Sequence, residues 1–213
     1  MYFPRELFER HVVASAVRSA CIALLLAAGP ALADITVTQL ANEGVILSDG
    51  ETRIMIDGMV VESYSVYGGL PPDAATQFEQ ASGAFAGVDL ALSSHRHHDH
   101  NQPQAACQFL GSSPETEFVS SAQVIDLIRE KCREMVTTQS RFRVIDPQYG
   151  QPEIIRVGET GVRIFPLSHG RGKYARLQNF GHLVTMGDLQ ILHVGDAAMD
   201  PTDYGRAGLD QVK

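Results

Sequence analysis

Residues 93–100 concentrate side chains that bind transition metals. They read Ser-Ser-His-Arg-His-His-Asp-His, and the pattern His-x-His-x-Asp-His within them supplies His95, His97, Asp99 and His100. In an extended loop, His95 and His97 project from the same side. Asp99 and His100 can turn toward an adjacent position. Because imidazole nitrogens and carboxylate oxygens are usual zinc ligands, this one segment is suited to holding one or two metal ions.

The alternative explanation is a solvated His-rich surface tract that picks up metal incidentally. The flanking sequence argues against it. An apolar run at 88–93 predicts a buried strand that leads directly into the histidines. Pro103 suits a first helical turn, with Asn101 or Gln102 as the cap, and the helix is expected to reach about Leu110. The candidate ligands are therefore expected between a strand end and a helix start.

Short β-rich runs precede this segment at 35–40, 44–48 and 53–56, separated by Asn-Glu-Gly and Asp-Gly turn signals. A helix is expected at 73–82. Downstream, the pattern predicts a helix at 122–133 and strands at 117–120, 142–145, 153–157, 162–167, 182–186 and 189–194. Mixed strands and helices of this kind indicate an α/β or α+β protein.

Together these landmarks resemble the metallo-β-lactamase superfamily over about residues 34–200. The resemblance implies a four-layer αββα sandwich with metals at one edge. It also implies that His169, in Phe-Pro-Leu-Ser-His-Gly, completes the ligand trio of the first metal with His95 and His97. Asp196, in Leu-His-Val-Gly-Asp, is similar to the aspartate that bridges both metals in the family.

Three further residues need an interpretation. By the resemblance, Asp57 matches an early aspartate that ends a strand and supports the metal loop; a simple turn aspartate is the alternative. His182 is an alternative to His169 as the third histidine ligand, but it begins a predicted strand whose pattern is typical of the protein core. His193 lies three residues before Asp196, which places it on the opposite face of the strand and favours a packing role.

The second metal of the family would be held by Asp99, His100, Asp196 and a final histidine. No histidine follows His193 in this sequence, and the pattern shows no C-terminal strand and helix for the second half of the sandwich. The expectation is a C-terminally truncated domain at 34–213, or a second site that is depleted of one ligand.

The function implied is a metal-dependent hydrolase acting on a small-molecule substrate. A zinc-bound hydroxide would attack an ester, lactone, thioester, phosphodiester or amide-type bond, and Asp99 would be the catalytic residue that moves the proton. One or two zinc ions are expected, although manganese or iron also suits these ligands. Arg171, Lys173 and Arg176 are candidates for a substrate anion, with a solvated loop as the preferred explanation. The alternative function is a degenerate, non-catalytic periplasmic metal-binding domain.

Composition sets the broad class of protein. The chain has 213 residues, 44% hydrophobic and 20% charged, which suits one globular domain. Its net charge of −8 argues against a nucleic-acid partner. Residues 1–33 resemble a secretory signal cleaved near Ala33, because arginines precede a short apolar run that ends in small residues. An exported, periplasmic protein without a stable membrane anchor is therefore expected.

Cys107 and Cys132 would remain after removal of this signal. An exported chain with two cysteines can form one disulfide. However, the apolar helical spacing of Val124 and Ile128 continues to Cys132. A buried thiol is therefore the preferred interpretation.

Overall fold

The computed structural model describes residues 34–209, except for 63 and 65–66. The predicted signal peptide at 1–33 lies outside these residues. Among the helices that the structure describes, none combines the length and the hydropathy needed to cross a membrane.

The first sheet contains six strands in the order of the sequence. They are β1 (Thr36–Gln39), β2 (Val45–Ser48), β3 (Arg53–Ile56), β4 (Leu90–Leu92), β5 (Glu117–Ser120) and β6 (Phe142–Val144). The first three strands pair antiparallel, and the pairs from β3 to β6 are parallel. Parallel neighbours need crossover connections, and helices supply them here.

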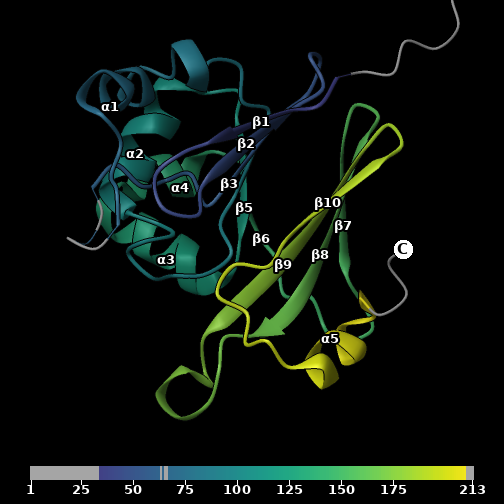
Figure 1. Ribbon diagram of the computed structural model, residues 1–213. Coiled ribbons are helices and arrows are strands. Elements are labelled where there is room, and N and C mark those ends of the chain that lie inside the picture. Colours follow the sequence, from purple (N-terminus) through teal and green to yellow (C-terminus); the bar gives the residue numbers. More distant parts are fainter. Residues whose placement is uncertain (1–33, 63, 65–66, 210–213) are drawn as a thin grey trace, which may run out of the picture. The chain divides into compact units, whose positions relative to one another are not determined.

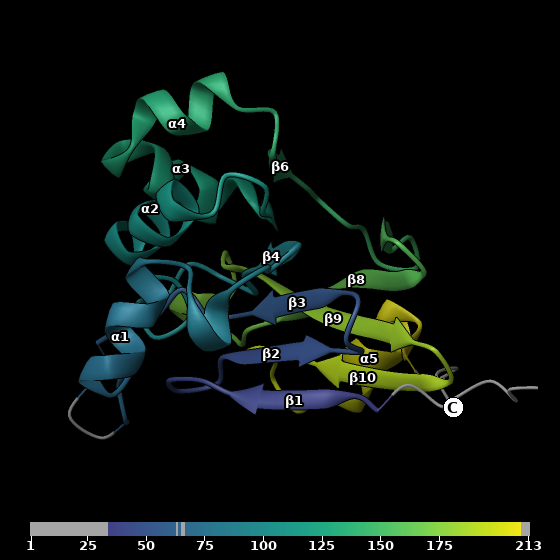
Figure 2. The same cartoon turned by 90° about the horizontal axis from the view of Figure 1, so that it is seen from above.

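The crossover helices all pack on one face of this sheet, as Figure 2 shows. Right-handed crossovers that always advance in the same direction along a sheet place their helices on one side. Phe78, Phe109 and Ile128 bring the helices into one core with Met55 and Phe118 of the strands. The helices are α1 (Pro72–Glu79), α2 (Pro103–Ser112), α3 (Ala122–Lys131) and α4 (Arg133–Thr138).

The second sheet is antiparallel, with the strand order β10-β9-β8-β7. Its inner face packs against the first sheet, where Leu47, Ile54 and Leu90 meet Val162 and Val184 in a shared core. The strands are β7 (Glu153–Val157), β8 (Thr160–Ser168), β9 (Gln178–Met186) and β10 (Leu189–His193).

The outer face of the second sheet is covered by α5 (Pro201–Ala207), so the layers run helix, sheet, sheet, helix (Figure 1). The predicted mixed α/β class and four-layer sandwich are confirmed. The sequence pattern predicted no helix at the position of α5. The start and stop signals of α5 were present in the sequence: Asp200 accepts a hydrogen bond from the Thr202 N–H, and Gly208 ends the helix with a φ of 80°.

The structure joins Cys107 of α2 to Cys132 in a disulfide. The preference for a buried free thiol was therefore wrong. Cys132 also breaks the single helix predicted at 122–133, because its φ of −137° and ψ of 59° are not helical. The bridge thus links α2 to the junction between α3 and α4.

Loss of this bridge is expected to lower the free energy of unfolding by about 3 kcal/mol, because the disulfide closes a loop with a sequence separation of 25 residues. The measurement is urea denaturation of the Cys107→Ala/Cys132→Ala variant beside the wild type. Wild-type protein treated with a reductant is the control and should match the variant. Equal stability of the oxidised wild type and the variant would contradict this expectation.

Candidate metal centre

Four of the predicted ligands lie on the loop between β4 and α2, as expected from the sequence: His95, His97, Asp99 and His100. The backbone N–H groups of His100 and Asn101 both donate to the carbonyl of His97, at 3.0 and 2.9 Å. This turn reverses the chain after His97. His100 is thereby directed back toward the buried His95, while α2 begins at Pro103.

The other two ligands come from the second sheet. His169 directly follows β8, and Asp196 follows β10 after a short turn. Gly195 has a φ of +54°, and a Cβ atom there would lie 2.6 Å from Ser94 Cβ and 2.7 Å from Asn179 Oδ1. Only glycine therefore allows the chain to pass this close to the metal loop and present Asp196.

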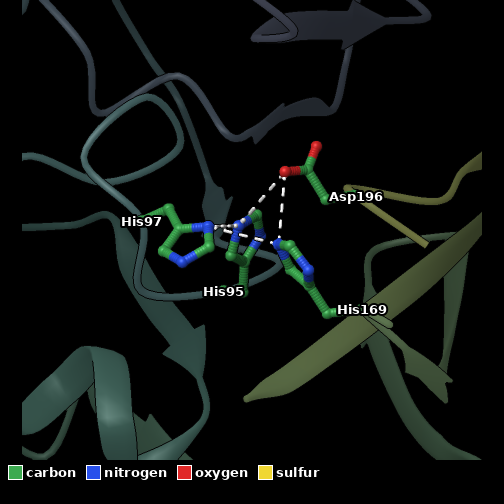
Figure 3. Close-up of side chains that lie close together, drawn as sticks. All are labelled: His95, His97, His169 and Asp196. Carbon is green, nitrogen blue, oxygen red and sulfur yellow. Dashed lines mark hydrogen bonds and ion pairs between the residues drawn. The ribbon is translucent and has the colours of Figure 1, made fainter. Parts of the chain in front are cut away.

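The side chains of His95, His97, His169 and Asp196 point toward one another (Figure 3). Nδ1 of His97 lies 3.0 Å from Nε2 of His95 and 3.2 Å from Nε2 of His169. Oδ2 of Asp196 lies 3.6 Å from Nε2 of His95 and 3.3 Å from Nε2 of His169. Four ligands at zinc bond lengths in a tetrahedron are spaced by about 3.3 Å. The donor set and its spacing therefore fit a zinc-type cation.

The electrostatics of this group also suit metal binding, which requires neutral imidazoles. Burial, followed by the charge of His100, lowers the pKa of His95 to about 3. Burial and the neighbouring His169 lower the pKa of His97. Ser94 Oγ lies 3.0 Å from Nδ1 of His95, which leaves Nε2 of His95 facing the other donors. The lowered pKa values of His95 and His97 thus favour the neutral imidazoles that can bind a metal.

Asp57 contacts the metal loop through Ser94 and His100. Its fully buried carboxylate accepts hydrogen bonds from the N–H and the hydroxyl of Ser94, both at 2.6 Å, and contacts Nδ1 of His100 at 2.8 Å. Burial opposes its ionisation, but the hydrogen bond and charge of His100 outweigh burial and hold the pKa of Asp57 well below its usual range. Asp57 has a φ of +50°, a left-handed conformation that aspartate tolerates better than most residues. These contacts join Asp57 to Ser94 and His100 of the metal loop.

His100 lies at a second donor group, formed with Asp196 and Glu43. Its Nε2 atom is 3.1 Å from Oδ1 of Asp196. Burial alone would lower the pKa of His100, yet the contacts with the carboxylates of Asp196 and Asp57 raise it to about 10. The carboxylates therefore favour a positive charge at this point, which a proton or a cation can supply.

The structure does not bring every predicted ligand into these two groups. The carboxylate of Asp99, expected to bind the second metal, belongs to neither. Asp99 instead lines the cavity in front of His97 and His169. His182, the rival to His169, is fully buried in β9 and is not among the gathered donors.

Sequence reasoning missed two contributors. His193, interpreted as packing, accepts a hydrogen bond at Nδ1 from the Gly195 N–H and donates from Nε2 to the carbonyl of Glu43 at 3.0 Å. Its side chain therefore connects β10 with the turn between β1 and β2. Glu43 was regarded only as part of an Asn-Glu-Gly turn. The only sequence feature that could have marked Glu43 as a candidate ligand was the position of its carboxylate on a tight turn at the end of the first strand.

An open cavity of about 630 Å³ lies in front of the first donor group. The Tyr174 ring stacks on His169 with ring centroids 5.1 Å apart, and Lys173 Nζ lies 4.8 Å from the centroid of the Tyr174 ring. Aromatic and basic side chains thus stand beside the donors. The cavity is lined by Tyr64, Arg96, His97, Asp99, His169, Lys173, Tyr174, Leu177 and Asp196.

Four layers with histidine and aspartate donors gathered between the ends of the two sheets define a protein of the metallo-hydrolase fold type. The sequence model for the beta-lactamase superfamily domain matches residues 36–212. The match covers most of the sequence, and the chain belongs to the beta-lactamase superfamily. No curated protein shows significant sequence similarity to it.

Solved structures with the same fold include a proposed metal-dependent hydrolase from Parabacteroides distasonis, at 20% identity and a TM-score of 0.52 over 78% of this chain and 63% of that one. A possible metal-dependent hydrolase from Veillonella parvula has 16% sequence identity and a TM-score of 0.53. The match covers 83% of this chain and 69% of that one. CmlA, a diiron beta-hydroxylase from Streptomyces venezuelae, has 18% sequence identity and a TM-score of 0.53. The match covers 86% of this chain and 33% of CmlA. This chain spans less than two thirds of the Parabacteroides protein. At these identities the likeness establishes the fold alone.

Proposed function

We propose that this protein is a metal-dependent hydrolase of small molecules. The observation that carries the proposal is the first donor group, in which atoms from His95, His97, His169 and Asp196 lie within 4.8 Å of one another beside an open cavity. A zinc ion bound there would activate water for attack on a carbonyl or phosphoryl centre. Zinc is the first choice, and the diiron centre named for CmlA keeps iron as the alternative.

The chain's own residues would bind and orient the substrate. Asp99 lines the cavity beside His97, where its carboxylate can orient the attacking water and pass a proton to the leaving group. Arg96 and Lys173 line the same cavity and can receive a carboxylate or phosphate of the substrate. Tyr174 offers an aromatic wall next to His169. The favoured substrate is therefore a small anionic ester, lactone, thioester, phosphodiester or amide.

We further propose that the protein works after export, in the periplasm. The disulfide between Cys107 and Cys132 supports an oxidising compartment, because such bonds are rare in the cytosol. The arginine-led apolar segment within 1–33 supports the same destination.

The test combines metal content with turnover. Purified protein is expected to carry metal near a whole-number ratio and to hydrolyse at least one member of a panel of anionic ester, lactone, thioester, phosphodiester and β-lactam substrates. Removal of the metal with a chelator should abolish turnover, and added Zn²⁺ should restore it. Tightly bound metal without turnover on any member would favour the non-catalytic metal-binding alternative. Absence of metal binding would remove the basis of the proposal.

A further inference from the structure

The turn between β1 and β2 is built against the metal loop. Asn42, with a φ of 53°, donates from Nδ2 to the carbonyl of Asp99 at 2.9 Å. A Cβ atom on Gly44 would lie 2.7 Å from the carbonyl oxygen of Asp57, so glycine is needed for this close approach. The residues on both sides of Glu43 therefore hold the turn in contact with the chain segments that carry the site.

Glu43 itself is held by its backbone and reaches the site with its side chain. Its carbonyl accepts the hydrogen bond from His193 Nε2. Its Oε2 atom lies 3.9 Å from Nε2 of His100, and the side chain is 48% exposed. The carboxylate of Glu43 thus faces His100 from the solvent side, opposite Asp57.

Nε2 of His100 lies between the carboxylates of Glu43 and Asp196. His100 is 1% exposed, and Nδ1 is engaged by Asp57. Nε2 is buried and has no hydrogen-bond partner among the described residues, although it approaches the carboxylates of Asp196 and Glu43. A buried imidazole nitrogen directed between two carboxylates is the arrangement that a cation ligand requires.

We propose that Glu43, His100 and Asp196 hold a second cation, with Glu43 taking the carboxylate position that the family resemblance gave to Asp99. Asp196 can serve both groups because Oδ2 faces His169 while Oδ1 faces His100. The exposed side of Glu43 leaves room for water ligands. This inference rests on the proposed function, since it assumes that the first donor group also binds metal.

The test is a titration of the metal-free protein with Zn²⁺ by calorimetry, repeated with Co²⁺ by absorbance. The wild type is expected to bind two equivalents. Glu43→Gln keeps the side-chain shape and removes the charge, and it should weaken the second equivalent by at least about tenfold while the first is unchanged. Glu51→Gln, on the exposed turn after β2, is the matched control and should bind as the wild type does.

The remaining outcomes separate the two proposals. If Glu43→Gln binds both equivalents as the wild type does, the second cation site is overturned and the proposed function is not. The same holds if the wild type binds one equivalent only, or if Asp99→Asn and not Glu43→Gln loses the second one. No binding by the wild type at either step would instead overturn the proposed function. Circular dichroism of each variant establishes that the fold is retained.

Discussion

His169→Ala is expected to abolish tight metal binding and, with it, hydrolysis. His169 supplies one of the three imidazoles of the first donor group, and its Nε2 atom contacts both His97 and Asp196. Loss of an outer-shell partner of a metal ligand costs roughly 10–100-fold in affinity, and loss of the ligand itself should exceed this. The measurement is the dissociation constant for Zn²⁺, with turnover on the best substrate of the panel as the second readout.

His182→Leu is the contrasting variant. His182 is fully buried in β9, and neither ring nitrogen has a hydrogen-bond partner among the described residues. Burial lowers its pKa to about 3, so it is neutral at physiological pH. Leucine should therefore replace it with metal affinity preserved. If His182→Leu lost metal while His169→Ala retained it, the assignment of the third imidazole would be wrong.

Asp57→Ala is expected to lower the free energy of unfolding of the metal-free protein by about 3–5 kcal/mol, as removal of one partner from a buried charged pair does. The substitution leaves the Ser94 N–H, the Ser94 hydroxyl and His100 Nδ1 without their acceptor in a buried position. Urea denaturation in the presence of a chelator measures this effect without a contribution from metal binding.

Two further variants define the origin of this loss. Asp57→Asn keeps the size and part of the hydrogen bonding, and should be less destabilising than Asp57→Ala. Asp188→Ala removes an aspartate from the exposed turn between β9 and β10 and should change stability by no more than about 0.5 kcal/mol. A loss for Asp57→Ala as small as that for Asp188→Ala would show that Asp57 does not support the loop.

Much of the fold could be predicted from sequence because its signals are local. The apolar run at 88–93, the proline at 103 and the Gly187-Asp188 turn each mark an element that the structure contains. The family resemblance supplied the four layers and brought His169 and Asp196 to the histidine loop. α5 was missed because seven residues give little periodicity, although Asp200 and Gly208 mark its ends.

The parts that could not be predicted depend on contacts between distant segments. Glu43 and His193 are 150 residues apart, and no local pattern shows that β10 ends beside the first turn. The alternation argument for His193 failed because Gly195 turns the chain beyond β10, so strand geometry no longer relates His193 to Asp196. The disulfide escaped prediction for the same reason, since the spacing that marks Cys132 as apolar does not show that Cys107 faces it.

The donors of the first group come from both sheets: His95 and His97 follow β4, whereas His169 and Asp196 follow strands of the second sheet. A cation bound by all four residues would therefore link the two sheets of the sandwich. Thermodynamic linkage then makes the stability of the whole fold depend on the free metal concentration, by about 2.7 kcal/mol at one hundred times the dissociation constant. The free metal concentration would in this way set the fraction of the chain that is folded.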